Sequence, residues 1–297
     1  MMKKRFLGVL IVLCVLSPVV FAAGCEEIVF PTALGGTGLG YVVRNGEVHI
    51  EDYTDSTIRD TVTIPDDVDG VPVTVISDFS VCNAETLRVI NIGKNVREIG
   101  AWAMTNNQKL QAFNVSPENE YFTSIDGVIY TKDLETLVAY PPAKGVDIND
   151  DNVVLDDSAG LSYTIPDGVR VIRSKAFYKC GYLEEINLPD SLEIIEEKAF
   201  HYCSAVKGFT LPEGLIEIGK DAFAYCWSED FTELSIPASV ERIGEYAMYN
   251  TNAIVTIYVN KTESEVAALE ESGAWGRKWY PTNNGRERDG YELIYAE

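Results

Sequence analysis

The stretch Leu183-Glu-Glu-Ile-Asn-Leu-Pro-Asp-Ser-Leu-Glu-Ile-Ile-Glu-Glu-Lys-Ala-Phe-His-Tyr-Cys203 decides the fold, because its last five residues recur at a fixed interval. The same five-residue pattern also ends at Cys180 and at Cys226, which lie 23 residues before and after Cys203. The stretch opens with the alternating apolar spacing of a short strand and continues through a turn into a second apolar segment. Such a unit cannot bury its apolar side alone, so neighbouring units are expected to stack on it.

The same register extends over most of the chain. Each unit has an aliphatic anchor and, twelve residues later, an apolar partner, except that residues 69–73 lengthen the first step by five. The anchors are Ile64, Ile92, Ile165, Leu188, Leu211 and Ile236, and the partners are Val81, Met104, Phe177, Phe200, Phe223 and Met248. This spacing predicts an α/β-type repeat solenoid, mostly β: a right-handed leucine-rich repeat array of units of about 23 residues, with terminal caps.

Three local sequences carry a resemblance to a known family. Thr61-Val-Thr-Ile-Pro-Asp-Asp-Val-Asp-Gly-Val-Pro-Val-Thr74 holds the lengthened first step. Phe113-Asn-Val-Ser-Pro-Glu-Asn-Glu-Tyr-Phe-Thr-Ser-Ile-Asp-Gly-Val-Ile-Tyr130 runs on through Thr131-Lys-Asp133 to Val138-Ala-Tyr-Pro-Pro142, and Ile/Leu-Pro with Ala-Phe-x-x-Cys recurs. Together they resemble the BspA-like leucine-rich repeats of bacterial surface proteins, over about residues 41–260. The resemblance implies a hairpin insertion at about residues 113–144 and adhesion-type binding of host proteins or other cells. Repeat proteins bind many partners, so the ligand stays open.

The chain departs from that family's pattern in three places. An acidic insertion occupies about residues 145–160, and two extra residues lie near Trp227. The cysteine is missing after Val81, Met104 and Met248. The acidic insertion offers oxygen ligands for calcium but lacks the glycine and glutamate of a calcium-binding EF-hand loop, so we expect a solvated loop.

The N-terminal segment is expected to direct export. Three basic residues precede an apolar run that ends in Ala22-Ala-Gly-Cys25, so residues 1–24 are read as a signal peptide. The ending resembles a bacterial lipobox, which implies lipidation of Cys25, although Ala22 stands where leucine is usual. A membrane-spanning anchor and ordinary cleavage with a free Cys25 remain alternatives. Residues 25–40, rich in glycine, would then be a tether, and residues 261–297 a C-terminal cap.

The charge balance limits the partners. The formal net charge is −22, and removing residues 1–24 would take away three positive charges and no acid, which gives −25. Such a chain repels nucleic acid and anionic lipid headgroups, so no nucleic-acid partner is expected and the membrane would be reached only through the lipid anchor. We expect a monomer in the bacterial cell envelope, exposed at the surface, with an extracellular protein or glycan as partner.

The recurring cysteines raise the question of a metal site or a disulfide. In a stacked array, Cys180, Cys203 and Cys226 would lie about 4.8 Å apart from one coil to the next and point the same way. The outer two could not converge on one zinc ion, and parallel side chains make a disulfide awkward. We therefore predict a structural ladder of buried free thiols beside Phe177, Phe200 and Phe223, with no metal and no cofactor.

Catalysis has little support in this sequence. Only His49 and His201 are present, and no nucleophile or metalloprotease motif accompanies them. His201 takes the position of Tyr178 and Ala224 in adjacent units, so we expect a surface residue there. We predict a non-enzymatic binding protein, with a surface glycan hydrolase or a purely structural envelope protein as alternatives.

The outward residues of the first strand in each unit form the candidate binding face. Residues that alternate with the inward apolar positions point to solvent, and here they are mostly small and uncharged. Such a strip in an acidic protein would let a flat protein or glycan surface approach, although crowding between strands would also favour small residues. The candidate face comprises Asn91, Asn114, Thr164, Glu185, Asn187, Thr210, Glu233, Ser235 and Tyr258.

Overall fold

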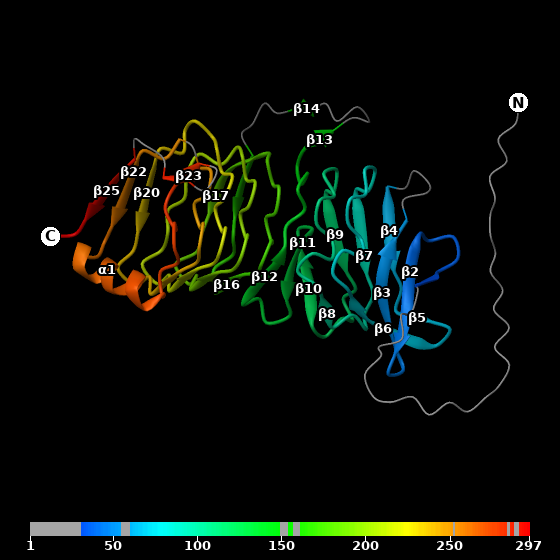
Figure 1. Ribbon diagram of the computed structural model, residues 1–297. Helices are drawn as coiled ribbons and strands as arrows, with labels where there is room; N and C mark the ends of the chain where they lie inside the picture. Colours follow the sequence, from blue (N-terminus) through cyan, green and yellow to red (C-terminus); the bar gives the residue numbers. More distant parts are fainter. Residues whose placement is uncertain are drawn as a thin grey trace, which may run out of the picture. The chain divides into compact units, whose positions relative to one another are not determined.

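The computed structural model describes residues 31–54, 60–148, 154–156, 161–251, 253–283, 286–287 and 291–297. Residues Pro31–Glu297 form one compact unit of stacked coils (Figure 1). The expected signal peptide, Cys25 and most of the acidic insertion lie outside the described residues. The described part is mostly β, as predicted, with one α-helix, α1 (Glu263–Ser272).

The first strand of each coil forms one side of the array, which we call the strand face. Its parallel strands fall into three separate sheets rather than one. These are β4 (Thr61–Ile64), β7 (Val89–Ile92) and β9 (Ala112–Val115); β15 (Leu161–Thr164) and β17 (Leu183–Asn187); and β20 (Glu233–Ile236), β22 (Thr256–Val259) and β25 (Glu292–Tyr295).

The second apolar segment of each coil forms another side. Its register repeats from coil to coil, with Ile172 opposite Ile195 and Ile195 opposite Ile218. One sheet holds β10 (Phe122–Ile125), β11 (Val128–Thr131), β12 (Thr136–Ala139), β16 (Val171–Ile172), β18 (Ile194–Ile195), β19 (Glu217–Ile218) and β21 (Arg242–Ile243). A second sheet holds β1 (Thr32–Ala33), β2 (Leu39–Arg44), β3 (Glu47–Tyr53), β5 (Asp67–Val68), β6 (Val71–Ile76) and β8 (Glu98–Ile99). Two small hairpins complete the strands: β13 (Asp147–Ile148) with β14 (Val154–Asp156), and β23 (Thr282–Asn283) with β24 (Arg286–Glu287).

The third side, which we call the turn face, contains tight turns in place of strands. In two neighbouring coils the backbone enters the left-handed region twice, at Lys175 and Lys179 and again at Lys198 and Tyr202. That conformation is unfavourable for residues with a β-carbon. Hydrogen bonds between coils offset the cost, as where the Phe177 N–H donates to the Ala199 carbonyl at 2.8 Å.

The core repeats with the coils. Phe177, Phe200 and Phe223 are fully buried and stack with ring centroids 5.1 and 5.5 Å apart. Cys180, Cys203 and Cys226 are free thiols and equally buried. The Sγ of Cys203 donates to the Phe177 carbonyl and that of Cys226 to the Phe200 carbonyl, each at 3.2 Å. Each thiol therefore packs as a small apolar group with one weak donor.

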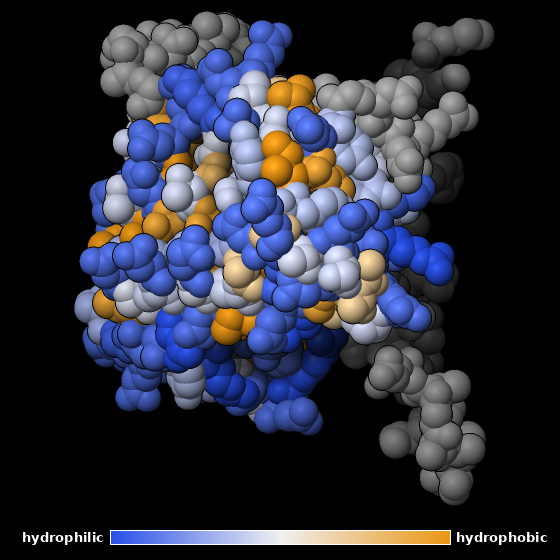
Figure 2. Space-filling model, turned by 90° about the vertical axis from the view of Figure 1, so that its left-hand side faces the viewer, coloured by the Kyte–Doolittle hydropathy of each residue, from blue (hydrophilic) through white to orange (hydrophobic). Residues whose placement is uncertain are grey.

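The two ends of the array close differently. Part of the expected N-terminal tether belongs to the fold instead, because Leu39 is buried and β1 pairs with β2. At the other end, helix α1 starts with a capping box at Thr262 and is followed by Trp275 and Trp279, both buried. Hydrophilic residues cover most of this C-terminal end, with smaller hydrophobic areas between them (Figure 2).

Candidate binding surfaces

The outward residues of the strand face form ladders of hydrogen bonds. The Asn114 side chain donates to Asn91 at 2.9 Å, and Asn91 donates to Thr63 at 3.0 Å. Asn187 makes the same kind of bond to Thr164, at 3.3 Å. These bonds hold the side chains in one orientation, so a ligand would meet a surface that is already ordered.

The candidate residues do not form the continuous row that the sequence suggested. Asn91 and Asn114 lie on the first sheet, Thr164, Glu185 and Asn187 on the second, and Glu233, Ser235 and Tyr258 on the third. Thr210 is exposed but belongs to no strand. Ser235 and Tyr258 are neighbours in register, and Tyr258 is 37% exposed.

Two grooves open on the strand face. Around the ends of β4, β7 and β9 lies a groove of about 490 Å³, lined by Asp66, Asn91 and Asn114 among others. A second groove, of about 520 Å³, lies between β17 and β20 where Thr210 stands outside a strand. Glu185 and Glu233 line this second groove.

A different site, which the sequence did not suggest, lies on the turn face where the hairpin insertion joins the array. We call it the seam pocket. The chain leaves β12 after Ala139 and turns only at residues 142–145, beyond the first of two prolines, so the left-handed turn found at Lys175 in the next coil is missing between β12 and Tyr140. The turn that carries Trp102 therefore faces the turn that carries Tyr178, with ring centroids 5.5 Å apart.

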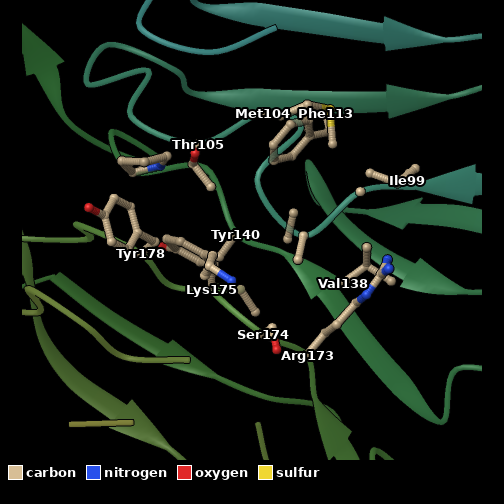
Figure 3. A pocket seen from close by; sticks show the side chains of 15 residues that line it. Ile99, Met104, Thr105, Phe113, Val138, Tyr140, Arg173, Ser174, Lys175 and Tyr178 are labelled. Atoms are coloured by element: carbon tan, nitrogen blue, oxygen red, sulfur yellow. The ribbon is translucent and has the colours of Figure 1, made fainter. Parts of the chain in front are cut away.

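The seam pocket has an apolar side and a cationic side. Met104 and Phe113 lie on one side of it, while Tyr140, Lys175 and Tyr178 lie on another (Figure 3). Arg173 extends beside Val138, and Thr105 and Ser174 add hydroxyl groups. The cavity holds about 30 Å³, the room of one water molecule.

Lys175 is the most constrained charge at this site. Its side chain is only 8% exposed, and its Nζ lies 4.1 Å from the centroid of the Trp102 ring. Burial lowers the pKa of its ammonium, against the opposing effect of the Glu197 carboxylate. Within the described residues, neither Lys175 nor Arg173 forms an ion pair with a carboxylate.

Aromatic side chains continue from the pocket along the turn face. This aromatic strip consists of Phe79, Trp102, Tyr178, His201, Tyr202, Tyr225, Trp227 and Tyr249, each within 6 Å of another member by ring centroids. His201 was expected at the surface but is 8% exposed, because its ring stacks on Tyr178. Burial, with Lys198, Lys179 and Lys175 nearby, lowers the pKa of His201 to about 4. The sequence signal for this strip was an aromatic residue one or two positions after each Ala-Phe pair.

Neither a metal centre nor a membrane span emerges from the part of the chain that the structure describes. In those residues no group of three or more His, Cys, Asp or Glu side chains could hold a metal ion. No helix there is both long and apolar enough to cross a bilayer.

The comparison with protein families decides the family. The model described as "BspA type Leucine rich repeat region" matches in six copies, over residues 54–136 and 157–269. The chain belongs to this family. The resemblance read from the sequence is therefore confirmed, and the chain is a BspA-type leucine-rich repeat protein. No curated protein shows a significant match to it.

Several solved bacterial structures are similar to the chain. The pneumococcal vaccine antigen PcpA is 13% identical, with 90% of this chain and 99% of that one covered, at a TM-score of 0.48. A leucine rich cell surface protein from Faecalibacterium prausnitzii is 17% identical, with coverage of 82% and 98% and a TM-score of 0.44. A leucine-rich repeat protein from Eubacterium ventriosum is 14% identical, with coverage of 76% and 77% and a TM-score of 0.45. Similarity at this level carries no inference about the ligand.

Proposed function

We propose that this BspA-type repeat protein is a non-enzymatic binding protein of the bacterial cell surface, exported, anchored through a lipid on Cys25, and recognising an extracellular protein or glycan. The array itself would be a right-handed solenoid of units of about 23 residues, closed at its C-terminal end by residues 261–297. Family membership supports a role in interaction, and the strand face supplies the site. The observation that carries the site is the groove of about 520 Å³ lined by Thr210 and by Asn187, whose side chain is held by a hydrogen bond to Thr164 at 3.3 Å.

The strand face suits recognition of a flat partner. Its side chains are short and already hydrogen-bonded, so binding would immobilise few additional rotamers. The second groove, with Thr210 beside Asn187, lies on the same face. Glu185 and Glu233 at that groove would favour a partner that is not strongly acidic.

The test is a double variant, Asn187→Arg with Thr210→Arg. A partner is first isolated by pull-down from extracellular material and identified, and its Kd is then measured for the parent and the variant. Two arginines in the second groove are expected to weaken binding at least tenfold by obstruction. Glu271→Arg, an exposed residue of α1, changes the net charge by the same amount and is the matched control.

The outcomes separate the alternatives. Equal weakening by Glu271→Arg would mean that net charge, rather than the strand face, controls binding. Unchanged binding by the double variant would contradict the strand face as the site. Turnover of a bound glycan would favour the hydrolase alternative.

A further inference from the structure

The seam pocket contains two basic residues in a protein whose net charge is strongly negative. The chain has 46 acidic and 24 basic residues, and several of its arginines lie against carboxylates of neighbouring coils. Arg97 bonds to Glu47 at 2.7 Å, and Arg242 bonds to Glu217 at 2.8 Å. Arg173 and Lys175 line one cavity without such a partner among the described residues. Glu197, Asp78 and Glu196 act on the Lys175 ammonium only from a distance, so in the described part of the chain two positive groups without a paired carboxylate lie at this cavity.

The size of the pocket limits what enters it. A cavity of about 30 Å³ accepts one water or the head of a small anionic group, but no ring. A carboxylate matches this room and would accept from the Lys175 ammonium, while the Arg173 guanidinium beside Val138 adds a second positive charge on another side of the pocket (Figure 3). A bound carboxylate would also offset the desolvation of Lys175, which is only 8% exposed.

The groups around the carboxylate position favour a carbohydrate. Thr105, whose hydroxyl donates to the Trp102 carbonyl at 3.2 Å, lies on the same side of the pocket as the Tyr178 ring, and Ser174 adds a hydroxyl group next to Arg173 (Figure 3). The aromatic strip continues from Tyr178 to Tyr202, and from there to Trp227, which is 44% exposed. Tyrosine and tryptophan offer an apolar ring with a polar edge, which suits sugar rings that carry both C–H and hydroxyl groups.

We propose that the seam pocket binds the carboxylate of an acidic sugar, whose ring remains at the mouth against Tyr178 while the glycan chain follows the aromatic strip. The juxtaposition of Arg173, Lys175 and Tyr178 at the missing turn carries this inference. The seam pocket lies on the turn face, so this proposal does not depend on binding at the strand face.

Isothermal titration calorimetry tests the proposal on the full chain. The probe is a tetrasaccharide of alternating glucuronic acid and N-acetylglucosamine, compared with a neutral N-acetylglucosamine tetrasaccharide. The parent is expected to bind the acidic probe and not the neutral one. Lys175→Met and Arg173→Gln should each weaken binding about tenfold or more, because each removes a positive charge from the lining of the pocket.

Matched controls separate this site from general charge effects and from misfolding. Arg170→Gln removes one positive charge from an exposed arginine paired with Glu193, and should leave binding unchanged. Lys175→Met keeps an apolar side chain against Trp102, and thermal unfolding checks that this variant is folded. Arg173→Gln tests the pocket without altering Lys175. The double variant Asn187→Arg with Thr210→Arg should bind the acidic probe like the parent, whatever becomes of the strand-face proposal.

Four results would overturn the inference. These are no binding of the acidic probe, equal binding of the neutral probe, equal weakening by Arg170→Gln, and loss of binding in the strand-face variant. A glutamate-rich peptide of equal charge is the last comparison. If it binds as tightly as the acidic probe and with the same dependence on Lys175, the pocket binds acidic peptides and the assignment to a sugar is overturned.

Discussion

At the scale of single residues, the recurring cysteine follows from packing. The three ladder thiols lie under the turns of their own coils, each fully buried. Burial raises the pKa of the Cys226 thiol to about 12, and it raises the pKa of Cys180 and Cys203 well above the ordinary value. Since the thiolate is the reactive form, these groups are both inaccessible and in the unreactive state at neutral pH.

The prediction is that a thiol reagent distinguishes Cys82 from the ladder. Cys82 is half-buried, so it should react in the native protein, whereas Cys180, Cys203 and Cys226 should react only after denaturant is added. Mass spectrometry of labelled peptides measures this residue by residue. Native labelling of the ladder at the rate of Cys82, or a stoichiometric metal retained on the three thiols, would contradict the packing account.

His201 gives the protein a pH-dependent contribution to stability. Its pKa is lowered to about 4 in the folded state from 6.5, so between these values the unfolded chain binds more protons. Stability contributed by neutral His201 is therefore present above about pH 6.5 and is lost as the pH falls towards 4. After discounting for solvent screening, the loss is roughly 1–2 kcal/mol in the free energy of unfolding.

The variant His201→Tyr tests this contribution. Tyrosine occupies the same position at Tyr178, so the aromatic stack should survive. Denaturant unfolding at pH 7 and pH 4.5 is expected to show a smaller loss of stability for the variant than for the parent. An identical loss in both proteins would mean that carboxylate protonation elsewhere accounts for the whole effect.

At the scale of elements, close stacking of the coils requires glycine at one position of the turn. A β-carbon at Gly244 would lie 2.2 Å from the Lys220 backbone nitrogen, whereas one at Gly214 would meet no atom nearer than 3.4 Å. Gly244→Ala should therefore force two coils apart and cost about 1–3 kcal/mol of unfolding free energy, while Gly214→Ala should cost less than about 0.5 kcal/mol. Thermal unfolding of the two variants measures the difference, and equal stability would show that the coils do not pack this closely.

The sequence predicted the regular elements because they depend on a local, repeated pattern. The 23-residue interval from Ile172 to Ile195 and on to Ile218 is also the strand register. The break at Thr210 could not be predicted in this way, because the apolar spacing there is intact. Next to Thr210, Phe209 packs between Phe200 and Phe223, and Gly208 has a φ of 158°, a conformation that other residues rarely adopt. The backbone path at Thr210 thus depends on the contact of the Phe209 ring with two rings from other coils.

The seam pocket escaped prediction for a related reason. The hairpin insertion was visible in the sequence, but its effect on the turn face depends on how few residues return after β12. The sequence also gives no sign that Lys175 is buried, since lysine is mostly found at the surface. Only the packing of Trp102 against its neighbours in space shows that Lys175 is buried.

At the scale of the whole unit, the same seam divides the core. One buried cluster extends from Leu39 to Val138 and another from Val128 to Trp279. The two overlap only at the hairpin insertion, where Val128 and Val138 belong to different clusters. In stacked repeats each coil is stabilised mainly by its neighbours. Loss of packing at one end should therefore lower the local stability of its own cluster more than that of the cluster beyond the seam.

The variant Trp279→Ala tests whether the unit unfolds in two parts. Trp279 is fully buried, and its indole N–H donates to Glu270 at 2.8 Å, so truncation should cost about 3–5 kcal/mol. Amide hydrogen exchange is expected to accelerate in residues 161–251 far more than in residues 61–115. Trp227→Ala, which truncates an exposed ring of the aromatic strip, should change neither region. Equal acceleration on both sides of the seam in Trp279→Ala would mean that the two clusters unfold as one cooperative core and that the missing turn does not weaken the coupling between them.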